Sequence, residues 1–122
     1  MNEEKIVFYM DSRGKSPVFE YLLKLGKKRD KNSRITYNNI NEYILVLCEV
    51  GFSAGEPYIK HIEGDIWELR PLSERVFFAG WEGGRYILLH HILKKTQATP
   101  RRDIDTAKQR LTEARKEPEI YG

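Results

Sequence analysis

The chain has 122 residues, 40% of them hydrophobic and 32% charged, which is enough apolar material for one core in a chain too short for a second folded domain. This composition excludes a disordered tail, and no apolar run approaches the roughly 18 residues of a membrane helix. The net charge of +3 suits an anionic partner without requiring one.

The excess positive charge is confined to the middle of the chain. Residues 58–102 carry eight Lys and Arg side chains against five Asp and Glu, whereas the rest of the chain carries thirteen of each. All three histidines lie in the same stretch. The one cysteine, Cys48, stands in an apolar run, which favours a buried thiol in a reducing compartment. Because the N-terminus has no apolar secretion segment, we expect the protein to stay in the cytoplasm.

The first half of the chain predicts one strand and two helices. Residues 5–10 favour a strand that ends in a turn at residues 11–14. Ser16 and Pro17 begin a helix that Gly26 closes. Residues 31–50 predict a second helix, stopped by Gly51, because one set of apolar residues follows helical spacing. This set is Ile40, Tyr43, Ile44 and Leu47.

The second half predicts strands and a closing helix. Residues 66–70, 75–81 and 85–93 read as strands, with residues 58–62 as an added edge. Short turns at Pro71-Leu72-Ser73-Glu74 and Glu82-Gly83-Gly84 make the sheet antiparallel. Thr99 and Pro100 begin a helix whose apolar stripe is Ile104, Ala107, Leu111 and Ala114.

This element order, β-α-α-β-β-β-α, predicts an α+β fold with a small antiparallel sheet. Two N-terminal helices pack on one face of the sheet, and a C-terminal helix closes the domain. We expect residues 1–117 to form a single domain and residues 118–122 to be a frayed tail.

The turns predict which strand residues lie opposite one another. With residues 72 and 73 at the first tip, Arg70 lies opposite Arg75 and Glu68 lies opposite Phe77. With residues 83 and 84 at the second tip, Phe77 lies opposite His90. One face then collects Glu68, Arg70, Arg75, Phe77, His90 and Lys94. The other collects the nearly apolar set Trp67, Leu69, Val76, Phe78, Ile87, Leu89 and His91. A three-residue second turn would instead exchange His90 for His91 and Lys94 for Lys95.

Two opposed arginines repel each other unless an anion or a carboxylate lies between them. A structural network of Glu68, Arg70 and Arg75 is one interpretation. An anion site is the other, because a lysine and a histidine converge on the same face. Phosphate suits such a site, since arginine binds it in a bidentate manner. Phe77 is then placed to stack on a base.

The histidines have plainer interpretations as well. A histidine in an apolar strand is usually a hydrogen-bonded core residue, and a lysine pair at a strand end is usually a solvated edge. Adjacent His90 and His91 point to opposite faces, so a shared metal ion is not expected, and one distant cysteine gives no support to a zinc site. No nucleophile elbow marks a serine hydrolase. We therefore expect neither a metal nor another cofactor.

Several blocks of the chain, taken together and in order, resemble the phage-derived HigB toxins of the RelE/ParE superfamily. The resemblance extends from the first strand to the last helix. Its blocks are Gly55-Glu56-Pro57-Tyr58-Ile59-Lys60-His61, Ile66-Trp67-Glu68-Leu69-Arg70-Pro71, Arg75-Val76-Phe77-Phe78, and His90-His91-Ile92-Leu93-Lys94-Lys95-Thr96 through Thr99-Pro100.

The resemblance implies a RelE-like fold and a metal-independent endoribonuclease that cuts messenger RNA in the ribosomal A site. It implies inhibition by a HigA-like helix-turn-helix antitoxin in a hetero-oligomer. Its catalytic residues would be Arg70, Arg75, His90 and Lys94, with His91 as the base if the register slips. Its RNA-binding residues would be Lys60, Phe77, His91, Lys95, Thr96 and Arg101.

One departure concerns the proton acceptor. RelE is associated with a tyrosine near its C-terminal end, whereas residues 94–102 contain none, and Tyr121 belongs to the predicted tail. The chemistry then rests on Lys and Arg alone if no histidine serves as the base. Two rival functions share this sequence pattern: a ParE-like inhibitor of DNA gyrase, and a non-catalytic module that binds RNA or an antitoxin.

Overall fold

The computed structural model describes residues 5–95 and 98–122, and it has the predicted α+β fold with a five-stranded sheet. Two helices follow the first strand and a third follows the last strand. The elements are β1 (Ile6–Phe8), α1 (Pro17–Lys27), α2 (Lys31–Val50), η2 (Gly51–Ala54), β2 (Ile59–Glu63), β3 (Ile66–Leu69), β4 (Glu74–Trp81), η3 (Glu82–Gly84), β5 (Arg85–Leu93), α3 (Arg101–Lys116) and η4 (Pro118–Tyr121).

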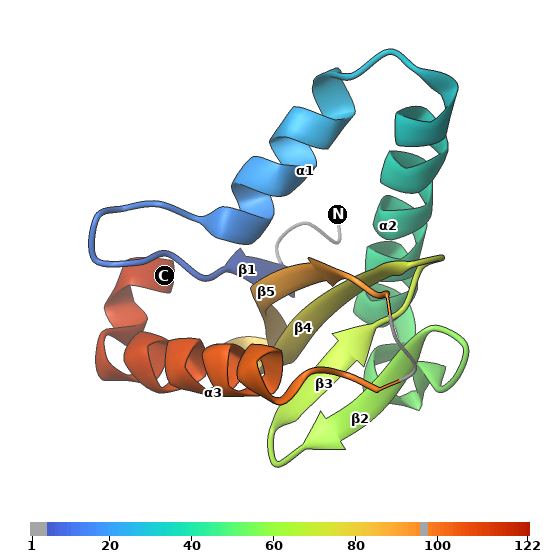
Figure 1. Cartoon of the computed structure of the whole chain (residues 1–122). Coiled ribbons are helices and arrows are strands. Elements are labelled where there is room, and N and C mark those ends of the chain that lie inside the picture. Colours follow the sequence, from blue (N-terminus) through green and yellow to red (C-terminus); the bar gives the residue numbers. More distant parts are fainter. Residues whose placement is uncertain (1–4, 96–97) are drawn as a thin grey trace.

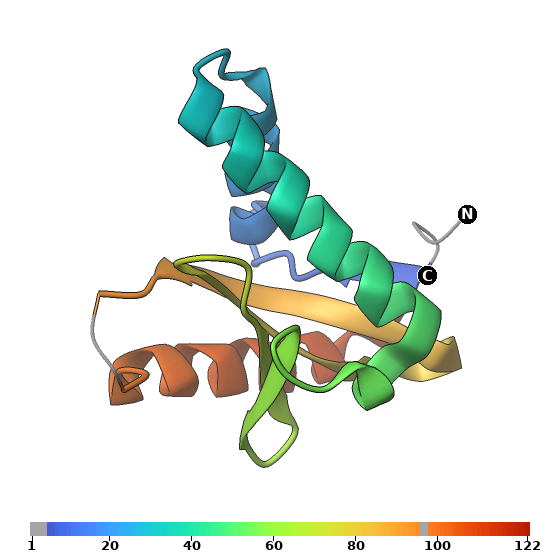
Figure 2. The same ribbon diagram turned by 90° about the vertical axis from the view of Figure 1, so that its right-hand side faces the viewer.

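The sheet separates two layers of helices. Figure 2 shows α2 above the sheet and α3 beneath it, and Figure 1 shows α1 on the same side as α2. Ala107, Leu111 and Ala114 of α3 share one buried cluster with Phe77 on the lower face of the sheet. Residues of α1 and α2 share another cluster with Phe78 on the upper face. Adjacent residues of β4 therefore belong to opposite layers, as the alternation of a strand requires.

The sheet order is β1-β5-β4-β3-β2. The neighbours from β2 to β5 are antiparallel, as the short turns predicted, and β2 is the predicted edge. β1 departs from the predicted antiparallel sheet because it pairs with β5 in parallel. A parallel neighbour requires a long connection, and here the two helices and three strands that separate β1 from β5 provide it.

A β-bulge settles the two register alternatives. Phe77 lies opposite His90, as the two-residue turn predicted, but Trp81 lies opposite Arg85, which encloses a three-residue turn. The extra residue is taken up between Phe77 and Phe78, where Leu89 has no direct partner. Beyond the bulge the alternation reverses. Ile87 and Leu89 therefore face the α3 layer, which corrects their predicted place beside Phe78.

Helix α1 buries a narrower stripe than its apolar content suggests. Val18, Leu22 and Leu25 follow i, i+4, i+7 spacing and are buried, whereas Phe19 is 46% exposed and Leu23 is 49% exposed. Pro17 occupies the first turn as predicted, and the helix runs one residue past Gly26. The narrow buried stripe of α1 thus leaves two large apolar side chains exposed on its outer face.

The last residues form a short 3-10 helix, η4, and not the predicted frayed tail. The Tyr121 hydroxyl donates to the carbonyl of Met10 at 3.2 Å and accepts from its amide at 3.0 Å. Arg85 donates to the Tyr121 carbonyl at 2.9 Å. These contacts attach the end of the chain to the segment that follows β1 and to the start of β5. Within the described residues, no helix is long and apolar enough to cross a membrane.

Candidate functional site

Four cationic side chains gather where β3 turns into β4 and β5 ends. Lys60 of β2 lies opposite Glu68 of β3, and Arg70 directly follows that strand. Arg75 is the second residue of β4, and Lys94 directly follows β5. The Lys94 amide donates to the Ser73 carbonyl at 2.8 Å, which ties the end of β5 to the turn between β3 and β4. We call Lys60, Glu68, Arg70, Arg75 and Lys94 the Glu68 cluster.

Glu68 sits between the two arginines. Its Oε1 lies 3.4 Å from Arg70 Nε and 3.8 Å from Arg75 Nε, within ion-pair range. The Glu68 side chain is only 1% exposed, so a buried carboxylate offsets the repulsion between two arginines on neighbouring strands. Both predicted guanidinium groups therefore lie together around one carboxylate.

Arg75 is also held by the turn itself. Its Nη1 donates to the Leu72 carbonyl at 2.8 Å and to the Glu74 carbonyl at 2.7 Å. Leu72 has a φ of 56°, an uncommon conformation for a residue with a side chain, and these bonds help to fix it. Arg75 is consequently a rigid cation with little freedom to turn away from the cluster.

Three buried polar atoms of the Glu68 cluster have no hydrogen-bond partner within the described residues. They are Glu68 Oε2, Arg70 Nε and Arg75 Nε. Leaving such an atom unpaired costs about 1–3 kcal/mol, more for charged groups, so buried polar atoms in native proteins are nearly always partnered. The cluster thus keeps hydrogen-bonding capacity that the chain's described residues do not use.

Positive charge exceeds negative charge in this cluster. Burial lowers the pKa of Lys94, and Arg75, Arg70 and Lys60 lower it further, against the opposing effect of Glu68. The other carboxylate beside the cluster is Glu56, whose Oε1 lies 3.2 Å from Arg70 Nη1 and whose side chain is 68% exposed. Exposed ion pairs are weak, so this contact neutralises little of the excess. An anion would relieve the repulsion.

A hollow of about 540 Å³ lies beside the cluster, a size within the usual range of ligand sites. Lys94 forms part of its wall, together with the exposed Lys95 and Arg102. Its full lining is His91, Ile92, Leu93, Lys94, Lys95, Pro100, Arg102 and Asp103. The hollow therefore joins β5 to the start of α3 with three cations and one histidine.

His91 faces α1 and is positioned by two residues that the sequence did not single out. Its Nε2 lies 2.6 Å from Glu74 Oε1, and its ring stacks on Tyr21 at 3.8 Å. The Tyr21 hydroxyl donates to the same Glu74 oxygen at 2.7 Å. Burial raises the pKa of Glu74, but the hydrogen bonds from His91 and Tyr21 outweigh it and leave that pKa below its ordinary value. His91 Nδ1 has no partner within the described chain.

His90 faces the opposite layer and is fully engaged there. Its Nε2 lies 2.8 Å from Asp103 Oδ1, and its Nδ1 accepts from Arg110 Nη1 at 3.2 Å. Burial lowers the pKa of His90 even though the hydrogen bond to Asp103 opposes it. These contacts describe a neutral histidine that links β5 to α3, with neither ring nitrogen free to accept a substrate proton.

The remaining predicted site residues differ in whether they are buried, ion-paired or exposed. Phe77 is fully buried between the sheet and α3, so it cannot stack on a base, and that prediction is wrong. Arg101 is bound by both oxygens of Glu63 at 2.8 Å and by Asp105. Lys60 and Lys95 are exposed. Thr96 lies outside the described residues. No group of three or more His, Cys, Asp or Glu in residues 5–95 and 98–122 is arranged to hold a metal ion.

Residues 20–112 of the chain match a protein family described as "Phage derived protein Gp49-like (DUF891)". The matched range contains α2, the whole of β2 to β5, most of α1 and α3, and every member of the Glu68 cluster. No curated protein matches the chain.

Proposed function

Since this chain belongs to the phage-derived Gp49-like family, a toxin-like family of the RelE/HigB type, we propose that it is the toxin of a type II toxin–antitoxin system. Its proposed activity is ribosome-dependent cleavage of messenger RNA, which stops translation and growth. Because the proposed target is the ribosome, the proposed location is the cytoplasm. Its proposed inhibitor is a HigA-like antitoxin with a helix-turn-helix domain, bound in a hetero-oligomer.

The observation that carries the proposal is the surplus of cations around buried Glu68. Arg70 and Arg75 are preorganised on adjacent strands, and Lys94 stands beside them at the end of β5. Preorganised cations stabilise the charge that develops on a phosphate during its transfer, because they need no rearrangement. Each charge-assisted hydrogen bond to a phosphate oxygen contributes about 1.5–3 kcal/mol.

The reaction in this proposal is an internal displacement at phosphorus. The ribose 2′-oxygen forms a bond to phosphorus while the bond from phosphorus to the 5′-oxygen of the next nucleotide breaks. The products are a 2′,3′-cyclic phosphate and a free 5′-hydroxyl. One group must take the 2′-hydroxyl proton and another must give a proton to the departing 5′-oxygen.

His91 fits the role of proton acceptor better than His90. Glu74 engages His91 Nε2, which favours the tautomer with a free acceptor at Nδ1, and His91 also lines the hollow beside Lys94. Lys94 fits the role of proton donor, since a lysine of lowered pKa gives up its proton more readily than an ordinary one. Lys95 and Arg102 in the hollow are placed to bind flanking phosphates.

Inducible expression of the chain in a bacterial host tests the proposal. We expect growth arrest and new transcript 5′ ends inside translated regions, within minutes of induction. Blocked translation should abolish the new ends. Intact transcripts with relaxed plasmid DNA would instead identify a ParE-like gyrase inhibitor. Arrest without either change, or no arrest, would identify a non-catalytic binding module.

The proposed partner is tested by its neighbouring gene. We expect an adjacent reading frame of about 100 residues with a helix-turn-helix pattern, whose co-expression restores growth and co-purifies with the chain. Restored growth without a stable complex would contradict direct inhibition.

A further inference from the structure

The tip of the hairpin formed by α1 and α2 is strongly basic. Residues 24–34 contain six cations and a single acid, Asp30. That acid is occupied, because its side chain caps α2 by accepting from the Ser33 amide at 3.0 Å. None of the six cations forms an ion pair within the described part of the chain. They are Lys24, Lys27, Lys28, Arg29, Lys31 and Arg34.

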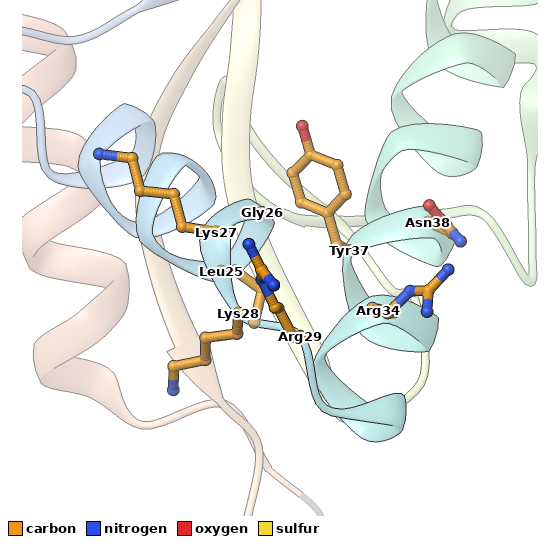
Figure 3. Close-up of a pocket in the computed structure, with 8 residues that line it drawn as sticks. All are labelled: Leu25, Gly26, Lys27, Lys28, Arg29, Arg34, Tyr37 and Asn38. Atoms are coloured by element: carbon orange, nitrogen blue, oxygen red, sulfur yellow. The ribbon is translucent and has the colours of Figure 1, made fainter.

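A groove of about 530 Å³ runs between the two helices at this tip. Figure 3 shows cations on both sides of it, with Arg29 rising from the connection and Arg34 standing on α2. Tyr37 lines the groove beside Asn38. Gly26 allows this arrangement, because a Cβ there would lie only 2.9 Å from the Tyr37 ring. The tip thus combines exposed cations with an aromatic ring and a side-chain amide.

The tip lies apart from the Glu68 cluster: it belongs to the helix layer above the sheet, over the end of the sheet where β3 turns into β4. In Figure 2 the connection between α1 and α2 is at the upper left, above the turn between β3 and β4. Figure 1 places both on the right. Phe78 and the other buried residues of the upper layer separate the two basic regions. The two basic regions are therefore separate surfaces, and a partner at the tip leaves the cluster free for another strand.

We propose that the α1–α2 tip is a second RNA-binding surface, which holds the phosphate backbone of folded ribosomal RNA outside the strand that is cut. The identity of this RNA rests on the proposed ribosome-dependent function. Lys28, Arg29 and Arg34 bind phosphates, as Lys and Arg do in most sequence-independent nucleic-acid contacts. Tyr37 and Asn38 favour RNA over an acidic protein, since unpaired bases stack on aromatic rings and bond to amides.

The surface should act on binding and not on the chemical step. Loss of three phosphate contacts should raise the Kd for RNA at least about tenfold and reduce the slope of log K against log salt by about 2–3. The rate of cleavage at saturating ribosomes should stay unchanged, because the tip contacts no reacting atom. We therefore expect kcat/KM to fall and kcat to remain constant.

The test compares the wild type with the triple variant Lys28→Gln, Arg29→Gln and Arg34→Gln. Binding is measured by filter retention at 50–200 mM salt (roughly the range over which phosphate contacts respond), with purified bacterial ribosomes and with deproteinised ribosomal RNA as probes. Equal thermal unfolding curves show that the variant folds.

A second triple variant removes the same charge from other exposed positions, in the turn after β1 and at the end of α3. It carries Arg13→Gln, Lys15→Gln and Lys116→Gln. We expect it to bind both probes within about twofold of the wild type, since general loss of charge has only a weak, screened effect.

Each outcome decides the proposal. Weakened binding to both probes in the tip variant alone supports it, even if the wild type cuts no message, in which case only the proposed nuclease function fails. Equal weakening in both variants overturns it, since net charge then explains the effect. Weakened binding to ribosomes with unchanged binding to deproteinised RNA also overturns it and identifies an acidic protein as the occupant.

Discussion

Two glutamate-centred clusters on the β2–β3 hairpin have similar composition and opposite character. Glu63, at the end of β2, is half-exposed, and both of its oxygens are bonded, to Arg101 at 2.8 Å and to Lys108. Hydrogen bonds from Arg101 and Lys108 lower the pKa of Glu63 to about 2. Glu68, in β3, is buried, and one of its oxygens has no partner within the described residues.

The difference separates a structural contact from a site. Arg101 and Lys108, the cations that bind Glu63, are paired with carboxylates and join α3 to the sheet. The cations of the Glu68 cluster lie close together, are incompletely hydrogen-bonded and outnumber the carboxylates around them. Natural proteins keep such unfavourable arrangements mainly where function requires them. Similar residue types in the two clusters therefore have different consequences, because burial and partner geometry differ.

The largest expected effect contrasts Arg70 with Lys108. Arg70→Ala should reduce message cleavage by about 10²–10³, the usual cost of losing one group that stabilises transition-state charge. Lys108→Ala removes the same charge from the Glu63 cluster and should leave cleavage within about twofold. Growth arrest and the yield of new transcript 5′ ends measure both variants. Equal toxicity of a folded Arg70→Ala protein would remove Arg70 from the site.

The second contrast concerns stability. Glu68→Gln leaves buried Arg75 without a countercharge and leaves Arg70 only its exposed contact to Glu56, so it should lower the free energy of unfolding by about 3 kcal/mol. Glu63→Gln affects a partly exposed contact, which solvent screens, and should lower it much less. Urea unfolding at pH 7 measures both. Similar losses would mean that the Glu68 cluster is no more strained than an ordinary surface contact.

A smaller effect of opposite sign is expected at Lys94. Its pKa is lower in the folded protein than in the unfolded chain, so its charge destabilises the fold at neutral pH, and the penalty fades only as the pH rises through both values. Lys94→Met should therefore raise stability by a few tenths of a kcal/mol at pH 7 while cleavage falls. A loss of stability would show that Lys94 is a structural residue.

The smallest effect concerns His90 and pH. Burial lowers its pKa in the fold, so the unfolded chain takes up the proton first, and His90 costs stability as the pH falls below about 6.5. Between pH 7.5 and pH 5 the urea midpoint of His90→Gln should decline less than that of the wild type. An equal decline would mean that His90 titrates normally and is not held neutral by α3.

The local features of the fold were predictable because each depends on neighbouring residues. Pro17 and Gly51 mark helix ends, and the turn between β3 and β4 placed Glu68 opposite Phe77. The bulge at Leu89 was not predictable, since neither turn alone determines how a one-residue mismatch is absorbed. It reversed the alternation beyond that point and moved Ile87 to the other layer.

The candidate site was predictable where strand pairing creates it. Arg70, Arg75 and Glu68 come together because their strands are joined by one short turn. The Glu74 contact to Tyr21 of α1 was not predictable, because no sequence signal relates residues 53 positions apart. The coverage of His90 by α3 was hidden for the same reason.

The charge balance of long stretches does not reveal the basic tip between α1 and α2. Outside residues 58–102 the cations and acids balance, yet residues 24–34 alone carry six cations and one acid. The balancing acids lie elsewhere in the chain. Only the pairing of α1 with α2 shows that four of these cations, Lys27, Lys28, Arg29 and Arg34, line one groove.

Cleavage by purified protein on ribosomes that carry a defined message tests the central claim most directly. The wild type should produce a fragment with a 2′,3′-cyclic phosphate at its 3′ end and a partner fragment with a 5′-hydroxyl, and the Arg70→Ala, Lys94→Ala double variant should bind the same ribosomes and produce neither. Cleavage by the folded double variant at the wild-type rate would contradict the account.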